Sequence, residues 1–239
     1  MNLSGPDYIK LYLLQDKFLT WWKTLGYPFY LTGGTALGRF YLNHRFSEDL
    51  DLFLNNDQQY PEYIAGFRTK IADHFKINMN ETLFADDYTR LFISEADNSL
   101  KIELINDVGY YAGEPAAYKY GLIDTPLNIL TNKLLAITSR DEPKDIFDII
   151  HISLNYDFNW QEIFSHVKQK AVINELDVAQ RLVSFPVEWL QMVNWLSSVP
   201  DPDMIRLQIG KIADDFLLGA TNSVSMHHIP IEMALPHQR

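Results

Sequence analysis

Apolar residues follow two different spacings in the two halves of this chain. Residues 49–55, DLDLFLN, alternate apolar and polar positions with period two, which indicates a β-strand. In the same half we expect further strands near 27–32, 76–84, 89–95 and 100–106, and helices over 7–25, 35–43 and 60–75. From residue 126 onward the spacing is helical, over 126–138, 143–154, 159–171, 176–197 and 203–219.

The order of these elements predicts an α+β fold, in which a mixed sheet with flanking helices is followed by a group of helices. The change of pattern divides the chain into an α+β domain over residues 1–122 and a helical domain over 123–239. The tail beyond residue 221 contains proline and histidine, and we expect it to be loosely held.

Composition narrows the class of protein. The 239 residues are 47% hydrophobic and 21% charged, which suits a folded chain with a large core. A formal charge of −11 repels nucleic acid and anionic membranes, so a nucleic-acid contact would need a local basic cluster or bound cations. Without cysteine there is no thiol catalysis and no cysteine-ligated zinc. The sequence shows neither a signal peptide nor an apolar run that spans a bilayer, so we expect a cytoplasmic protein without membrane contact.

Two acidic residues at the start of strand 49–55 are the first candidates for chemistry. Asp49 and Asp51 are two apart and project to one face, whereas Leu50 and Leu52 take the core face. Two arrangements would relieve their mutual repulsion: exposure of this face to water on an edge strand, or neutralisation by a bound metal ion. A third carboxylate would complete a Mg²⁺ site, from either Glu103 or Asp107. Glu103 is preferred because it lies within an apolar alternation, and two ions there would serve phosphoryl transfer.

A Gly-Gly turn precedes this strand. Gly33 and Gly34 allow close backbone approach, and the helix that follows presents free N–H groups to an anion. Thr35 adds a hydroxyl donor. These three residues can cradle a triphosphate, or they can form an ordinary strand-to-helix turn.

The stretch GGTALGRFYLNHRFSEDLDLF resembles the first motif of AbiEii/AbiGii-type nucleotidyltransferases, within the DNA polymerase β-like nucleotidyltransferase superfamily. Its matching positions are Gly33, Gly34, His44, Arg45, Ser47, Asp49 and Asp51. A second stretch, NKLLAITSRDEPKDIFDI, is similar to the later motif of that family through Lys133, Arg140, Lys144, Asp145 and Asp148. The resemblance covers residues 25–150 and implies a nucleotidyltransferase-like sheet.

The second stretch also has a physical interpretation of its own. Lys133 and Arg140 lie seven residues apart, so they share a helix face and together can grip the outer phosphates of an NTP. Asp141 is expected to cap the next helix, in which Lys144 and Asp148 are i,i+4 partners. Asp145 and Asp148 either pair with neighbouring cations to hold helices together or take part directly in catalysis.

Two residues of the first motif, Arg45 and Ser47, flank the acidic pair. Arg45 can brace Asp49 or contact a phosphate, and Ser47 can bind backbone in the approach loop. His44 is expected to pack or hydrogen-bond rather than to bind metal, and Lys101 is a weaker candidate for nucleotide contact.

These features predict a Mg²⁺-dependent nucleotidyltransferase that moves an NMP from an NTP to an acceptor hydroxyl. The catalytic and metal residues would be Asp49, Asp51 and Glu103. The family resemblance implies a toxin of a toxin–antitoxin or phage-defence system, with tRNA as an acceptor and a cognate antitoxin as partner. The alternatives are transfer to a small hydroxylated molecule, as in antibiotic-modifying enzymes, and a non-catalytic nucleotide-binding scaffold. Mg²⁺-dependent release of pyrophosphate distinguishes the enzymes from the scaffold.

Overall fold

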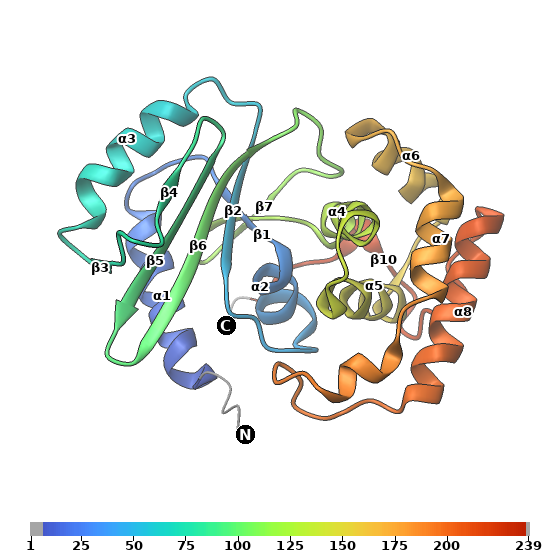
Figure 1. The fold of residues 1–239 in the computed structure, drawn as a ribbon. Coiled ribbons are helices and arrows are strands. Elements are labelled where there is room, and N and C mark those ends of the chain that lie inside the picture. The colour runs from blue at the N-terminus through green and yellow to red at the C-terminus, as the bar shows by residue number, and fades with distance from the viewer. Residues whose placement is uncertain (1–6, 238–239) are drawn as a thin grey trace.

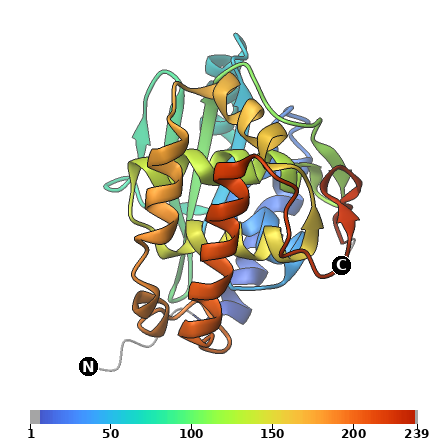
Figure 2. The ribbon, with the colours of Figure 1, turned by 90° about the vertical axis from the view of Figure 1, so that its right-hand side faces the viewer.

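A mixed β-sheet runs through the middle of the molecule, with helices on both faces (Figure 1). The computed structural model describes residues 7–237. Helices α1 (Tyr8–Lys23) and α3 (Tyr60–Ile71) cover one face, and α2 (Gly33–Leu37), α4 (Pro126–Ser139) and α5 (Pro143–Asn155) cover the other. An outer layer beyond α4 and α5 consists of α6 (Trp160–Lys170), α7 (Glu175–Val183) and α8 (Pro202–Leu218). Helices α7 and α8 face the viewer in Figure 2. This is the α+β class that the hydrophobic pattern predicts.

The sheet has the strand order β3-β5-β6-β2-β1-β8-β7, and β4 pairs with β5 beside this path. Its centre is formed by β1 (Tyr30–Thr32), β2 (Leu50–Asn55) and β6 (Asn98–Asp107). β2 pairs antiparallel with β1 and parallel with β6. The remaining strands are β3 (Lys76–Ile77), β4 (Leu83–Phe84), β5 (Tyr88–Glu95), β7 (Ala116–Tyr118) and β8 (Gly121–Ile123).

Period-two alternation decides which face of β2 is buried under α1 and α3. Leu50, Leu52 and Leu54 are buried, whereas the residues between them point to the opposite face and remain partly exposed. In α1 the buried positions recur at helical spacing, and Trp22 packs against Phe67 of α3 with ring centroids 5.4 Å apart. The core thus holds one face of β2 fixed, and leaves the other face available beneath α4.

Three details of the elements differ from the expectations drawn from the sequence. The helix expected over 176–197 ends at Val183, because Pro186 disfavours helix in the residue before it, and a 3₁₀ helix η2 (Val187–Gln191) follows. The strand expected near 76–84 is two short strands separated by a turn. The hairpin β7–β8 was not predicted, since each of its strands has only three residues.

Residues 222–237 of the C-terminal tail pack against the body, so for them the prediction of a loosely held tail is wrong. Asn222 is buried and donates hydrogen bonds to the carbonyls of Ser153 and Tyr156 at 2.6 and 2.8 Å. Strand β10 (Ile229–Pro230) pairs in parallel with β9 (Tyr156–Asp157), and the 3₁₀ helix η3 (Ile231–Met233) buries Ile231. These backbone and apolar contacts outweigh the turn-forming composition of the segment.

The change from sheet to helices falls between β8 and α4, within three residues of the predicted boundary. The division of the chain into two domains at that point stays a prediction. Among the residues that the structure describes, no helix is both long enough and apolar enough to cross a membrane.

Candidate active site

The carboxylates predicted at positions 51 and 103 lie side by side in the sheet. The parallel register of β2 and β6 pairs Asp51 with Glu103, and both side chains belong to the face that the core leaves partly exposed. Asp107 pairs with Asn55, four residues further along both strands. Strand register therefore brings Glu103, and not Asp107, beside Asp51.

Asp49 joins this pair through a lysine. The Lys101 ammonium lies 3.0 Å from Oδ2 of Asp49 and 3.1 Å from Oε2 of Glu103. The hydroxyl of Tyr88 donates a hydrogen bond to the other oxygen of Glu103. Burial raises the pKa of Glu103, but the Tyr88 hydrogen bond and the Lys101 charge outweigh it and lower this pKa below its usual value. Asp49, Asp51, Glu103 and Lys101 are called the carboxylate cluster below.

The carboxyl group of Asp51 has a strongly raised pKa. Burial, followed by the charges of Asp49 and Glu103, raises the pKa of Asp51 to about 7. Its carboxylate lies directly over Gly33, where an added Cβ would be 2.5 Å from Oδ2 of Asp51, and Gly33 itself has a φ of +68°. Glycine at this position thus serves both the backbone turn and the close approach of Asp51.

A divalent cation matches the chemistry of the carboxylate cluster. When all three acids are ionised, three carboxylates and one ammonium leave two negative charges in excess, and after burial the charges of Asp49 and Glu103 contribute to the raised pKa of Asp51. Within residues 7–237, however, no three acidic or histidine side chains are already placed to hold a metal ion. Lys101 instead lies between two of the oxygen ligands that Mg²⁺ would use.

Two other motif residues, Arg45 and Ser47, lie against Gly34 and line a polar cavity beside the carboxylate cluster. An added Cβ on Gly34 would collide with Nη2 of Arg45 and approach Oγ of Ser47 to 3.0 Å, so only glycine lets these side chains reach the cleft. The backbone of Ser47 is held by the Tyr12 hydroxyl at 3.1 Å and by the Gln15 amide at 3.2 Å.

Thr35 does not serve as a phosphate donor, contrary to the sequence prediction. Its side chain is fully buried, and its hydroxyl donates to the backbone carbonyl of Asp49. This contact ties helix α2 to the start of β2. Thr35 therefore positions Asp49 rather than a ligand.

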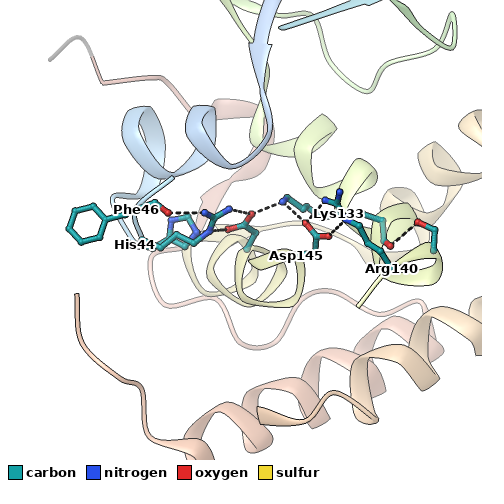
Figure 3. Close-up of polar contacts among 9 residues, drawn as sticks. His44, Phe46, Lys133, Arg140 and Asp145 are labelled. Carbon is teal, nitrogen blue, oxygen red and sulfur yellow. Dashed lines mark hydrogen bonds and ion pairs between the residues drawn. The ribbon is translucent and has the colours of Figure 1, made fainter. Parts of the chain in front are cut away.

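Opposite the carboxylate cluster, five charged side chains of alternating sign form a row: Arg45, Asp148, Lys133, Asp145 and Arg140 (Figure 3). We call it the ion-pair row. Arg45 binds Asp148 with two hydrogen bonds of 2.6 and 2.7 Å, and Lys133 lies 2.7 Å from Asp148 and 2.6 Å from Asp145. Arg140 closes the row with Nε at 2.7 Å from Asp145, and its side chain remains 56% exposed. The row joins α4 and α5 to the loop before β2.

Cations outnumber anions in the ion-pair row, whereas anions outnumber cations in the carboxylate cluster. Burial raises the pKa of Asp148, but the charges of Arg45 and Lys133 outweigh it and hold this pKa well below its usual range. Burial likewise opposes the ionisation of Asp145, and Lys133 and Arg140 again lower its pKa. Both acids are therefore firmly ionised, and three cations on two anions leave one positive charge facing the cleft.

These contacts correct two details of the sequence interpretation and agree with a third. Arg45 braces Asp148 rather than Asp49, and Asp148 pairs with Arg45, Lys133 and His44 rather than with Lys144. His44 Nε2 lies 2.8 Å from Asp148, in line with a hydrogen-bonding role.

The expected cap of α5 is also wrong. The residue before the helix is Glu142, which makes no side-chain cap, and Asp141 pairs with Nη1 of Arg181 at 2.8 Å. Arg181 reaches Asp141 from α7, a tertiary contact that a local capping rule does not foresee.

The carboxylate cluster and the ion-pair row face each other across two adjoining cavities. The first, of about 310 Å³, has polar walls that include Asp49, Asp51, Glu103, Lys101, Lys133 and Lys144. The second, of about 270 Å³, shares Asp51, Glu103, Lys133 and Arg140 and adds the apolar side chains of Phe53, Ile105 and Ile129. All the residues predicted to act in catalysis or nucleotide binding line one or both cavities, except Thr35 and Asp148, which are buried behind the walls. The two other candidates, His44 and Asp107, line neither cavity.

Tyr88 and Glu142 are site residues that the sequence did not reveal. Tyr88 reaches Glu103 because β5 pairs antiparallel with β6, and Glu142 lines the polar cavity from the loop between α4 and α5. Only the period-two pattern of β5 could have indicated Tyr88, and this pattern does not give the register. For Glu142 the sequence holds no signal.

Comparison with solved structures shows which known folds this chain resembles. The fold is similar to that of JHP933 from Helicobacter pylori, with a TM-score of 0.61 and 21% identity over 88% of this chain and 91% of that chain. It is also similar to MenT4, a nucleotidyltransferase toxin from Mycobacterium tuberculosis, with a TM-score of 0.58 and 15% identity over 89% of this chain and 84% of that chain. The fold is that of a nucleotidyltransferase.

The family follows from the sequence. A family model described as nucleotidyl transferase AbiEii toxin, type IV toxin–antitoxin system, matches residues 20–192. The chain belongs to this family of NTP-using, toxin-like nucleotidyltransferases. The matched region includes both motifs. No curated protein matches the chain.

Proposed function

We propose that this protein transfers a nucleoside monophosphate from an NTP to an acceptor hydroxyl in a Mg²⁺-dependent reaction. The acceptor oxygen forms a bond to the α-phosphorus, the bond from that phosphorus to the β-phosphate oxygen breaks, and pyrophosphate leaves. The observation that carries the proposal is the pairing of Asp51 with Glu103 across β2 and β6, on a cleft whose opposite wall is the ion-pair row.

The proton of the acceptor hydroxyl has a natural place on the carboxylate cluster. Asp51 and Glu103 are adjacent across β2 and β6, so a hydroxyl held beside them is within reach of a carboxylate oxygen that can take its proton. Glu103 is held in place by Tyr88 and Lys101, so it presents a fixed carboxylate to the incoming hydroxyl.

The opposite wall supplies the positive charge that a triphosphate needs. Lys133, Arg140 and Lys144 all line the polar cavity. Asp145 and Asp148 hold the Lys133 ammonium in one position, so it faces the phosphates without a large loss of side-chain freedom. Arg140 keeps much of its guanidinium exposed and can contact a phosphate of the bound nucleotide.

Asp49, Asp51 and Glu103 would hold the Mg²⁺, as one ion or two, because their oxygens are the hard ligands that Mg²⁺ prefers. When bound, the metal offsets the negative charge that develops on the phosphoryl oxygens.

The acceptor we propose is the end of a tRNA, as the family resemblance implies, and a strand end needs only a few contacts. The formal charge of −11 disfavours a long RNA footprint. A cognate antitoxin would be the partner in the cell.

Pyrophosphate release tests the reaction. The purified protein is incubated with Mg²⁺, each of the four radiolabelled NTPs and total tRNA, and both pyrophosphate and labelled tRNA are measured. We expect release to require Mg²⁺, and Asp51→Ala to abolish it. Asp97→Asn is the matched control, because Asp97 is an exposed acid in the β5–β6 turn and its loss changes the net charge equally. Release that persists in Asp51→Ala contradicts the proposal. In a parallel incubation that contains a small cationic alcohol, label on the alcohol and none on tRNA would reassign the acceptor.

A further inference from the structure

A third cavity, of about 150 Å³, opens beside the catalytic cleft. On one side it is bounded by the end of α4 and the loop that follows, from Ile137 to Glu142, and on the other by the segment from Arg181 to Trp189. We call it the Trp189 groove. It shares Arg140 and Glu142 with the polar cavity, so the two spaces adjoin.

Two aromatic rings line the Trp189 groove. Trp189 is 38% exposed, which is unusual for tryptophan in a folded chain whose Trp22, Trp160 and Trp195 are buried. Phe185 meets it edge-on, with ring centroids 6.4 Å apart at 82°. An edge-on pair leaves ring faces available for a third aromatic system.

The charged groups around these rings balance one another. Arg140 and Arg181 are matched by Asp141 and Glu142. Arg181 is fixed by a 2.7 Å hydrogen bond from Nε to the carbonyl of Ile137 and by its pair with Asp141. A neutral groove that offers both donors and acceptors beside aromatic faces suits an uncharged ring with polar edges, whereas the two carboxylates disfavour a phosphate.

The Trp189 groove also lies where a bound nucleotide could reach it. Arg140 is the end of the ion-pair row, on the opposite end from His44 (Figure 3). A nucleotide whose phosphates lie in the polar cavity would extend its base past Arg140 into the groove. Stacking of bases on aromatic side chains, assisted by arginine, is a common mode of nucleotide binding.

We propose that the Trp189 groove binds a nucleobase by stacking on Trp189. The inference rests on the proposed function, and it names a base subsite on the helical side of the cleft. The base belongs either to the incoming NTP or to the terminal nucleotide of the acceptor, and the cavity beside Phe53 and Ile105 serves the other nucleoside.

Direct binding tests the subsite without turnover. The probes are α,β-methylene analogues of the four NTPs, measured by isothermal titration calorimetry, and a fluorescein-labelled single-stranded RNA tetranucleotide, measured by fluorescence anisotropy. We expect Trp189→Ala to weaken one of the two probes at least about fivefold, the lower limit for loss of one stacked base. Trp189→Phe keeps a ring and should stay within about twofold of the wild type.

The matched control is Met192→Ala. Met192 follows η2 directly and is 76% exposed, but it does not line the groove, so its loss should change neither affinity. Ser184→Phe provides a second variant, because Ser184 is an exposed groove residue and a ring there would fill the space. If Trp189→Ala does not fold, Ser184→Phe decides.

Each outcome is informative. Weaker binding of the NTP analogue assigns the groove to the incoming base, and weaker binding of RNA assigns it to the acceptor. Unchanged binding of both probes in Trp189→Ala, or in Ser184→Phe when Trp189→Ala does not fold, overturns the inference. Failure of the proposed function would look different, since the wild-type protein would then release no pyrophosphate whatever these affinities are.

Discussion

The two walls of the cleft contain the same residue types in opposite electrostatic states. On the strands, Asp51 lies among acids, and its pKa is raised to about 7. On the helices, Asp148 lies between Arg45 and Lys133, and its pKa is held well below the usual range even though it is fully buried. Burial opposes ionisation in both places, so the neighbours decide the result. The difference teaches that the carboxylate cluster carries an excess of negative charge, whereas in the ion-pair row each acid is held between two cations in a rigid wall.

The largest expected effect is on activity, from Asp51→Asn. The change keeps the shape of the side chain and removes one of the three charges that would hold Mg²⁺, so we expect transfer to fall by about 10³-fold or more. Stability should stay equal or rise, because repulsion within the cluster decreases. Pyrophosphate release and thermal unfolding measure the two effects. A loss of activity accompanied by a large drop in melting temperature would mean that Asp51 is structural instead.

Asp148→Asn should have the converse effect. It leaves the buried charges of Arg45 and Lys133 without their shared partner, so we expect the free energy of unfolding to fall by about 3–5 kcal/mol. Urea denaturation measures this value. Asp203→Asn is the control, because the Asp203 side chain is 89% exposed and pairs only at the surface with Arg206, and its loss should cost less than about 1 kcal/mol. Equal effects of the two changes would contradict the contrast between the walls.

The free energy of unfolding should depend on pH through His151 of α5, which stays unprotonated in the folded protein. Burial, and then the neighbouring His44, lower the pKa of His151 from 6.5 to about 3. The unfolded chain therefore binds a proton at this histidine near pH 6.5 while the folded chain does not, so stability is complete above that pH and decreases as the pH falls. His151→Gln should make the slope of unfolding free energy against pH between 6.5 and 5 shallower, by about 1 kcal/mol per pH unit. Urea melts at several pH values provide the measurement, and an unchanged slope would show that His151 is not protonated on unfolding.

The smallest effect concerns Lys101, whose ammonium pairs with two proposed metal ligands. Lys101→Met removes this competing cation, so we expect Mn²⁺ to bind the NTP-free protein several-fold more tightly, within about tenfold. Titration calorimetry with Mn²⁺ alone gives the affinity and the number of ions. Weaker binding in the variant would show that Lys101 orients the carboxylates for the metal rather than opposing it.

Much of the fold is predictable from local patterns. The period-two run over Leu50–Asn55 marks the central strand, and helical spacing with Pro126 and Pro143 at the first turns marks α4 and α5. The tail beyond residue 221 and the hairpin β7–β8 were not predicted, because pairing with β9 and β1 holds these short segments, and their own composition does not.

The candidate site is only partly predictable for the same reason. Asp49, Asp51 and Glu103 can be selected because acids within apolar strands are costly, and the cost points to a compensating partner. Strand register brings the Tyr88 hydroxyl to Glu103, and loop position places Glu142 on the polar cavity. The Thr35 hydroxyl is buried and donates to the carbonyl of Asp49.

The sequence by itself determined which residues carry charge, which elements they belong to and which face of β2 is polar, since these properties depend on residues close together in the chain. Only the tertiary structure decided that Asp51 faces Glu103, that Lys101 bridges Asp49 and Glu103, and that Asp148 pairs with Arg45 across 103 positions. The physical reason is that electrostatic energy depends on distance in space, and packing brings together charges that the sequence keeps far apart.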